Sequence, residues 1–153
     1  MATASEHWAE LDAQRLRSAG LRVTAPRLAV LTAVRNGDHL AVEDIVLAAR
    51  ERIGSISTQA TYNALGALGR VGLVRRIEPA GSPARFETRV ADNHHHIICR
   101  RCGVVVDVSC VVSAAPCLEP ADPAGFVIDE AEIVFWGVCA SCQTAGDDND
   151  SEE

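Results

Sequence analysis

The sequence contains no lysine, few aromatic residues and no long apolar run. Aromatic residues make up 4% of the 153 positions, so the core must consist mostly of Val, Leu, Ile and Ala. Charged residues interrupt every apolar stretch well before the ~20 residues that a membrane-spanning helix requires. The N-terminus lacks the basic segment and following apolar segment of an export signal. These absences exclude a membrane protein, a collagen and a secreted disulfide-rich domain, and they predict a cytoplasmic globular protein.

The net charge of −7 is unevenly divided along the chain. Residues 1–90 hold twelve arginines against nine acidic residues, whereas residues 91–153 hold two arginines against twelve acidic residues. Residues 54–76 contain three arginines and no acidic residue. Because attraction to nucleic acid depends on the local field rather than on the total charge, the acidic total does not exclude a DNA-binding surface in the first half.

Residues 1–90 show the pattern of a winged helix-turn-helix domain. Helices are expected at about 8–19, 25–36, 42–53 and 58–71, where apolar residues recur at helical spacing. Thr24 and Ser57 are the expected N-caps of the second and fourth helices. Strands at 73–77 and 84–89, joined by a segment rich in turn-forming residues, are expected to form the wing.

Residues 91–143 are expected to form a small α/β domain, which makes the whole chain a member of the α+β class. Its strands are predicted at 97–99, 104–108 and 126–138. Three prolines between residues 111 and 125 allow at most a short helix there. Residues 144–153, which include five acidic residues in the last seven positions, are predicted to be a disordered acidic tail.

Four of the six cysteines form two Cys-X-X-Cys pairs. The first pair is Cys99 and Cys102, and the second is Cys139 and Cys142. Four thiolates at this spacing are the typical ligands of a structural zinc ion. The alternative is a pair of redox disulfides, which is less favoured because two such pairs flank strands.

The two remaining cysteines, Cys110 and Cys117, have no role in the main hypothesis. They could be buried thiols that act as small apolar residues, which is the favoured interpretation. A peroxide-reactive pair and a second, weak metal site are the alternatives.

A run of three histidines, His94 to His96, is the second candidate cluster. Successive side chains of a strand point to opposite faces, so His94 and His96 are expected to share a face and His95 to point away. Imidazoles together with carboxylates would suit Fe(II), Mn(II) or Zn(II). The alternative is a histidine-rich surface segment without a ligand.

Six segments in a fixed order resemble the Fur family of metal-dependent repressors. They are GLRVTAPR (20–27), HLAVEDI (39–45), QATYNAL (59–65), GLVR (72–75), HHHIICRRC (94–102) and GVCASC (137–142). Within that family the sequence is most similar to the actinobacterial FurA branch, which is associated with repression of catalase-peroxidase genes. The resemblance implies a homodimer whose second domain provides the dimerisation contacts.

The resemblance implies two metal centres in each subunit. Its structural zinc ligands correspond to Cys99, Cys102, Cys139 and Cys142. Its regulatory ligands, which hold Fe(II) or Mn(II) in peroxide sensors, correspond to His39, Glu87, His94, His96 and Asp107. In the peroxide-sensing members Fe(II) reacts with hydrogen peroxide, a ligand histidine is oxidised and the repressor leaves DNA. The histidines that are modified there correspond to His39 and His94.

The resemblance also implies that the partner is double-stranded DNA with a pseudo-palindromic operator, and that no membrane or small organic substrate is bound. Tyr62 corresponds to the base-contacting tyrosine of the recognition helix, and Arg22 to the basic residue near the minor groove. Thr58 and Gln59 of the same helix are also expected to bind DNA. Because a basic residue is common at the position of Thr58, more of the contact to phosphates is expected from Arg75 and Arg76. Two glycines, Gly66 and Gly69, should weaken this helix by up to ~1 kcal/mol each.

Several alternatives to a peroxide-sensing repressor remain open. The nearest is an iron-responsive repressor, because Asp107 resembles the residue of peroxide sensors whereas Glu87 resembles the choice of iron sensors. A third alternative is a repressor that senses peroxide through the thiols of Cys110 and Cys117. A metal-dependent hydrolase and a zinc-ribbon adaptor are less favoured, so no enzymatic activity is expected. Asn93, Ala114 and Glu132 stand where the family's further metal site would need ligands, so only two metals per subunit are predicted.

Overall fold

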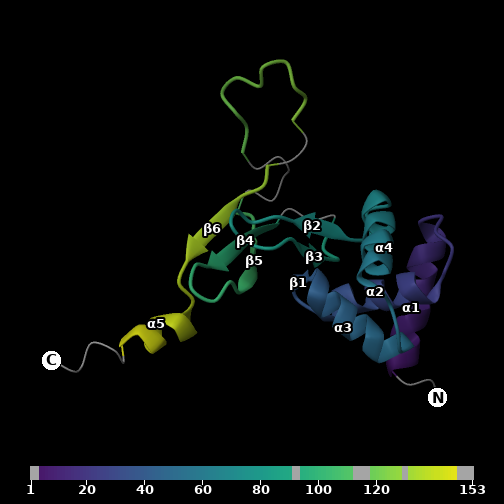
Figure 1. The fold of residues 1–153 in the computed structure, drawn as a ribbon. Helices are drawn as coiled ribbons and strands as arrows, with labels where there is room; N and C mark the ends of the chain where they lie inside the picture. Colours follow the sequence, from purple (N-terminus) through teal and green to yellow (C-terminus); the bar gives the residue numbers. More distant parts are fainter. Residues whose placement is uncertain (1–3, 91–93, 112–117, 129–130, 148–153) are drawn as a thin grey trace. The chain divides into compact units, whose positions relative to one another are not determined.

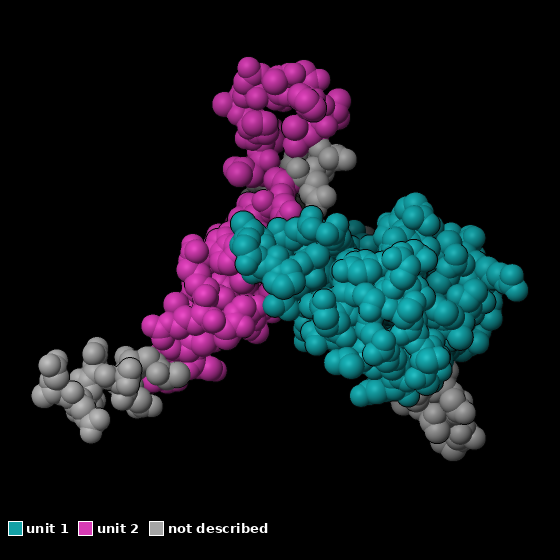
Figure 2. All heavy atoms as spheres, in the orientation of Figure 1, with its two compact units in different colours: residues 1–90 teal, residues 91–153 magenta. Residues whose placement is uncertain are grey.

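The computed structural model describes residues 4–90, 94–111, 118–128 and 131–147. The chain forms two compact units, residues 1–90 and residues 91–153 (Figure 2). Helices dominate the first unit and a small sheet dominates the second (Figure 1). This arrangement confirms the α+β class. No helix among the described residues is both long enough and apolar enough to cross a membrane.

Four helices account for most of the first unit. They are α1 (Ala4–Ser18), α2 (Ala25–Asn36), α3 (Val42–Ile53) and α4 (Thr58–Arg70). Both expected N-caps form, because Thr24 Oγ1 accepts from the Arg27 amide and Ser57 Oγ accepts from the Ala60 amide. Helix α3 ends at Gly54, whose φ of 79° lies in the left-handed region that glycine adopts without a steric penalty.

A three-stranded antiparallel sheet completes the first unit. Its strands are β1 (Leu40–Ala41), β2 (Arg75–Ile77) and β3 (Arg85–Glu87), in the order β1-β3-β2. The β2–β3 hairpin is the expected wing, and with the preceding helices it confirms the winged helix-turn-helix. The sequence did not indicate β1, because two residues are too few to show a strand period.

The core of the first unit is aliphatic, as the scarcity of aromatic residues requires. It joins α1, α2, α3 and α4 to the hairpin through Leu16, Val30, Leu31, Val34, Ile45, Leu68, Val74 and Phe86. Helix α4 contributes its buried side, and its other side faces solvent. The helix therefore has a rigid support for the residues that it exposes.

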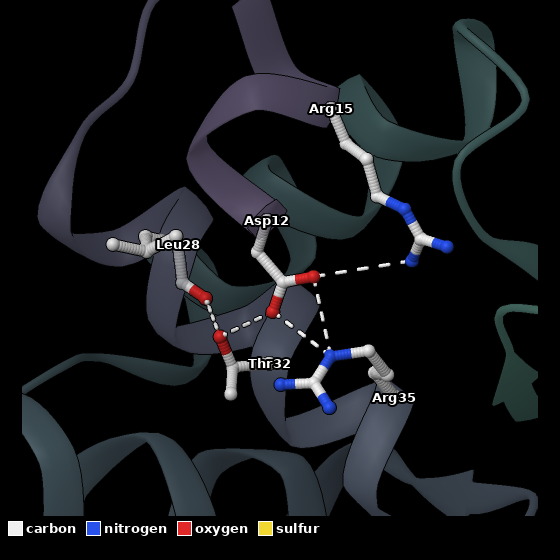
Figure 3. A network of polar contacts seen from close by, with 5 residues as sticks. All are labelled: Asp12, Arg15, Leu28, Thr32 and Arg35. Atoms are coloured by element: carbon white, nitrogen blue, oxygen red, sulfur yellow. Dashed lines mark hydrogen bonds and ion pairs between the residues drawn. The ribbon is translucent and has the colours of Figure 1, made fainter. Parts of the chain in front are cut away.

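One buried polar network joins α1 to α2 (Figure 3). Asp12 of α1 is fully buried. Its Oδ2 accepts a hydrogen bond from Thr32 Oγ1 at 2.9 Å and pairs with Arg35 Nε at 3.0 Å. The guanidinium of Arg35 also lies 4.8 Å from the centre of the Trp8 ring. The sequence did not single out Asp12, because Thr32 and Arg35 lie 20 and 23 residues away from it in the chain.

The second unit contains a three-stranded mixed sheet. Its strands are β4 (His94–Cys99), β5 (Val105–Ser109) and β6 (Val134–Gly137), in the order β5-β4-β6. Strand β4 pairs antiparallel with β5 and parallel with β6. Helix α5 (Ala140–Asp147) follows β6.

Three boundaries in the second unit differ from the sequence predictions. Strand β4 begins at His94 rather than at 97, and β6 begins at Val134 rather than at 126. The parallel register pairs His96 with Val134, so a much longer β6 would extend past the start of its partner. Helix α5 continues to Asp147, within the segment that was predicted to be a disordered tail, and residues 148–153 lie outside the described residues.

The proline-containing segment before β6 is described only in part. Residues 118–128 contain no helix, and residues 112–117 lie outside the described residues. The described part of this segment agrees with the expectation that its prolines allow at most a short helix.

Candidate metal centres and DNA-binding face

The four paired cysteines converge in the second unit. Cys99 ends β4 and Cys139 directly precedes α5. Their four Sγ atoms all lie within 4.8 Å of one another, and the Cys102 and Cys139 Sγ atoms are 3.7 Å apart. Tetrahedral zinc with Zn–S bonds of about 2.3 Å requires sulfur atoms about 3.8 Å apart. All four cysteines are free thiols rather than disulfides, so the donor set fits a structural zinc ion.

The backbone around these sulfur atoms favours negative charge at one of them. Hydrogen bonds from the backbone amides of Cys102 and Cys139 lower the pKa of Cys99 from 9.0 to about 6. In contrast, hydrogen bonds with the sulfur atoms of Cys139 and Cys102 raise the pKa of Cys142 to about 12. Several thiolates can therefore coexist here only with a compensating cation. A divalent ion that binds all four sulfurs supplies this compensation.

A second group of donors lies in the first unit. His39 directly precedes β1, and its φ of 55° is a left-handed conformation that few non-glycine residues adopt. The pairing of Leu40 with Phe86 brings His39 beside Glu87. His39 Nε2 lies 3.0 Å from Glu87 Oε2, and both side chains are 6% exposed. Two octahedral ligands at right angles, with bonds of about 2.1 Å, would have their donor atoms about 3.0 Å apart.

The backbone of His39 is held from the wing. Arg85 Nη1 donates a hydrogen bond to the His39 carbonyl oxygen at 3.1 Å. Strained backbone conformations often occur at functional sites, where neighbouring structure maintains them. Here β1, β3 and Arg85 together hold the imidazole beside the carboxylate.

A third group of donors lies in the sheet of the second unit. His94 and His96 lie on one face of β4, with ring centres 4.9 Å apart. Asp107 of β5 is the cross-strand partner of His96, and its Oδ1 lies 3.5 Å from His96 Nε2 and 3.8 Å from His94 Nε2. His95 instead lies by Phe135, with ring centres 6.5 Å apart. The predicted alternation of the three histidines is confirmed.

The five predicted nitrogen and oxygen ligands therefore form two groups, one in each compact unit. His39 and Glu87 form the group in residues 1–90. His94, His96 and Asp107 form the group in residues 91–153. All are chemically distinct from the four sulfur donors, because imidazole and carboxylate favour harder metal ions than thiolate does.

The exposed side of α4 carries three of the predicted DNA-binding residues. Thr58 and Gln59 are exposed in its first turn, and Tyr62 is 49% exposed. The Gln59 side chain donates a hydrogen bond to Asn63 Oδ1 at 3.0 Å. Asn63 thus belongs to the same polar surface, although the sequence did not single it out.

The three predicted DNA-contacting arginines have different surroundings. Arg22 is exposed between α1 and α2, and its carbonyl oxygen accepts from Arg27 Nη1 at 2.9 Å. The Arg76 side chain is 57% exposed and pairs with Glu78. The Arg75 side chain is only 21% exposed, and its Nε lies 3.9 Å from Glu87 Oε1. Arg75 thus faces a candidate metal ligand, which its predicted role as a phosphate contact does not explain.

The other cysteine and the further metal site are described only in part. Cys110 is half-buried, and Cys117 lies outside the described residues. Glu132 is exposed, whereas Asn93 and Ala114 lie outside the described residues.

A model of the ferric uptake regulator family matches residues 18–134, which is most of the chain. The chain belongs to the ferric uptake regulator family. This family member is 54% identical over 130 residues to the transcriptional regulator FurA of Mycobacterium tuberculosis, an alignment that covers 85% of this chain and 88% of that protein. As a member of this family, the chain is a metal-dependent transcriptional regulator.

Solved structures of two other metal uptake regulators share the fold of this chain. The ferric uptake regulator of Helicobacter pylori, described as having three functional metal binding sites, superposes with a TM-score of 0.67 at 24% identity, covering 88% of this chain and 93% of that chain. A zinc uptake regulator in complex with zinc and DNA superposes with a TM-score of 0.66 at 19% identity, covering 95% of this chain and 99% of that chain. At these identities the likeness shows the common fold.

Proposed function

We propose that this regulator is a homodimeric repressor that binds a pseudo-palindromic DNA operator and senses peroxide through a regulatory Fe(II) or Mn(II) site. Its targets would be oxidative-stress genes such as that of catalase-peroxidase, together with its own gene. The observation that carries the proposal is the separation of donor types, with four sulfur atoms in one cluster and imidazoles with carboxylates in two others. Such a protein acts where the DNA is, in the cytoplasm, and catalyses no reaction of its own.

The sulfur cluster would hold zinc for a structural purpose. Cys99, Cys102, Cys139 and Cys142 would occupy all four positions of a tetrahedral ion and leave none for a substrate. Structural zinc sites contribute about 10 kcal/mol or more of apparent binding free energy. Since the second unit has only a three-stranded sheet and one short helix among its described residues, this metal would supply much of its stability.

The imidazoles and carboxylates would hold the regulatory ion. His39 and Glu87 belong to the DNA-binding unit, whereas His94, His96 and Asp107 belong to the second unit. An ion shared by both groups would restrict the motion of one unit against the other, and so would set the spacing of two α4 helices in a dimer. A dimer that reads two half-sites requires a defined spacing. A change from 1:99 to 99:1 in favour of that state requires ~5.5 kcal/mol of differential binding.

Peroxide would act on the same ligands. Ferrous iron, when bound, would supply the electrons that cleave the O–O bond of peroxide and would place the oxidant beside an imidazole. His39 and His94 are the residues that we propose to be oxidised. An oxidised imidazole is a poorer donor, so the ligand set loses one of its members and the DNA-binding state is no longer favoured. His95 lies on the opposite face of β4, beside Phe135, and should be spared.

The dimer contact would form on that opposite face. Val106, Ile97 and Phe135 are aligned across the three strands by the register of the sheet. Their side chains are 53%, 39% and 49% exposed. A continuous row of exposed apolar side chains is typical of a protein–protein interface. A second copy of the chain would cover it.

The deciding experiment measures anaerobic binding of the Fe(II)-loaded regulator to its own upstream DNA, before and after a low dose of peroxide. Mn(II)-loaded protein is the control, because manganese should sustain DNA binding without the oxidation. The proposal expects release only with iron, together with a gain of one oxygen atom on His39 or His94 but not on His95. Release with both metals would implicate Cys110 and Cys117 instead.

An iron-responsive repressor of iron homeostasis genes is the second candidate. Glu87, which resembles the choice of iron sensors, lies 3.0 Å from His39 in the candidate site. Unchanged DNA binding after peroxide with either metal would overturn peroxide sensing and would support this second function.

A further inference from the structure

The two carboxylate oxygen atoms of Glu87 face different side chains, an imidazole and a guanidinium. Its Oε2 faces His39 Nε2 at 3.0 Å, and its Oε1 lies 3.9 Å from Arg75 Nε. Arg75 and Glu87 are direct cross-strand partners in the β2–β3 hairpin. All three side chains belong to the first unit, so the DNA-binding unit itself contains a candidate metal ligand and an arginine that faces it.

The neighbouring arginine provides a contrast. Arg76 is paired across the hairpin with Phe86 rather than with Glu87. Because successive side chains of a strand point to opposite faces, Arg76 points away from Glu87, and its guanidinium pairs with Glu78. The Arg75 side chain is 21% exposed and that of Arg76 is 57% exposed. Two adjacent arginines on one strand therefore have different electrostatic partners.

A divalent ion and a guanidinium compete for one carboxylate. When Glu87 donates its electrons to a metal ion, less negative charge remains to attract Arg75, and the ion itself repels the guanidinium. The Arg75 side chain is 21% exposed, so solvent screens this repulsion only in part. Arg75 would then gain most by moving its long side chain toward solvent or toward another anion.

A DNA phosphate is the anion that this position suits. Strand β2 follows recognition helix α4 after four residues, since α4 ends at Arg70 and β2 begins at Arg75. Residues 54–76 contain three arginines and no acidic residue, so this segment attracts an anion such as a DNA phosphate once a metal ion neutralises Glu87. Arginines beside a recognition helix commonly position the protein through phosphate contacts.

We propose that Arg75 links metal binding to DNA binding within the first unit. In the metal-free regulator Arg75 neutralises Glu87, and when the metal takes that carboxylate the guanidinium turns to a DNA phosphate. This inference rests on the proposed regulatory role of His39 and Glu87. It adds a coupling between metal binding and DNA binding that acts inside the first unit and does not depend on any motion of one unit against the other.

The link has reciprocal consequences, because metal and DNA must affect each other's affinity by the same factor. Arg75→Gln removes the competitor for Glu87, so Mn(II) should bind about fivefold or more tightly in the absence of DNA. The same change removes a phosphate contact only from the metal-loaded form. DNA affinity should therefore fall with Mn(II) present and change little without it. Arg75→Lys keeps the charge and should lie between wild type and Arg75→Gln in both measurements.

Arg76→Gln is the matched control, because it removes one arginine from the same strand but on the opposite face. It should leave the Mn(II) affinity at the wild-type value and should weaken DNA binding equally with and without metal. Circular dichroism of each variant would establish that the hairpin change has not unfolded the protein.

The experiment uses the full zinc-containing chain and two readouts. Calorimetry gives the Mn(II) affinity without DNA, and fluorescence anisotropy gives the operator affinity at several salt concentrations with and without Mn(II). Each additional phosphate contact steepens the logarithmic salt dependence by about 0.9. The wild-type slope should therefore become steeper when Mn(II) binds, and the slope of Arg75→Gln should not.

Two results would overturn the inference, and they are distinguishable. If His39→Ala and Glu87→Gln both leave Mn(II) affinity unchanged, the proposed regulatory site is wrong and the link fails with it. If those variants weaken Mn(II) binding but Arg75→Gln neither tightens it nor alters the salt slopes, only the link is wrong.

Discussion

Among the four cysteines that we propose to bind zinc, Cys102 is exposed whereas Cys99 is buried. Exposure does not make Cys102 dispensable, because the other three sulfurs alone cannot complete a closed tetrahedral site. Cys102→Ser should abolish stoichiometric zinc binding and unfold the second unit at moderate temperature. Elemental analysis of zinc and far-ultraviolet circular dichroism would measure both effects. The control Cys110→Ser, which alters a thiol outside the cluster, should retain zinc, and a fully zinc-loaded Cys102→Ser protein would contradict the assignment.

Asp12 provides a prediction about a single buried charge. Its replacement by Ala leaves Arg35, which is 16% exposed, and Thr32 without their carboxylate partner. The loss of one partner from a buried ion pair costs about 3–5 kcal/mol. Urea denaturation should show a decrease of this size in the free energy of unfolding.

Glu10 on the same helix is the control for Asp12. Its side chain is 60% exposed and pairs with Arg17 at 3.1 Å. Exposed ion pairs contribute about 0–1 kcal/mol, so Glu10→Ala should change stability little. Equal losses for both variants would mean that the α1 helix as a whole, and not the buried network, accounts for the effect.

At the scale of elements, recognition helix α4 has a hydrogen-bonded N-cap at Ser57 but also contains two glycines, Gly66 and Gly69. A Cβ atom added at Gly66 would meet only the flexible Arg70 Nη1, at 3.6 Å. Gly66→Ala should therefore stabilise the first unit by up to ~1 kcal/mol. Thermal unfolding of the full chain measures the change. A lower melting temperature would show that Gly66 is needed for a contact that the packing does not reveal.

Replacement of Gly54 by alanine is the matching test at a position where the backbone conformation, and not the available space, determines the effect on stability. Gly54 has open space around it but a φ of 79°. Alanine in this left-handed conformation costs about 1–2 kcal/mol. Gly54→Ala should thus lower the melting temperature whereas Gly66→Ala raises it, although both positions have room for a methyl group.

The wing shows how one element can serve two functions. Because side chains alternate along β2, Arg75 points toward Glu87, a candidate metal ligand, and Arg76 points toward solvent. Two adjacent residues of one strand can therefore serve different functions. The sequence predicted the strand, and it predicted both arginines as phosphate contacts. It could not distinguish them, because the cross-strand register that places Glu87 opposite Arg75 depends on the length of the intervening turn.

At the scale of the whole molecule, the apolar row on the second unit should determine the oligomeric state. Val106→Asp places a charge at the β5 end of the row, where a dimer would have to bury it. The variant should be monomeric at micromolar concentration by analytical ultracentrifugation, and its operator binding should be strongly reduced. Leu47→Asp, at a position of α3 that is 59% exposed, should remain dimeric. A dimeric Val106→Asp protein would place the interface elsewhere.

The sequence by itself determined the features that depend on near neighbours in the chain. The N-caps at Thr24 and Ser57 and the side-chain alternation of His94 to His96 each follow from a few consecutive residues. The two Cys-X-X-Cys pairs likewise predicted a cluster that the structure brings together. Local backbone geometry sets the caps, the alternation and the spacing within each Cys-X-X-Cys pair, so a local pattern is sufficient to predict them. The meeting of the two distant pairs was inferred from the four ligands that a structural zinc ion requires.

Only the tertiary structure decided which distant residues meet. The short strand β1, the left-handed backbone of His39, the orientation of Arg75 and the burial of Asp12 all depend on partners far away in the sequence. The same holds for β6, whose start follows from its register with β4 and not from its own apolar pattern. The physical reason is that hydrogen-bond register and desolvation act between segments, and a single segment does not specify the partner that satisfies them.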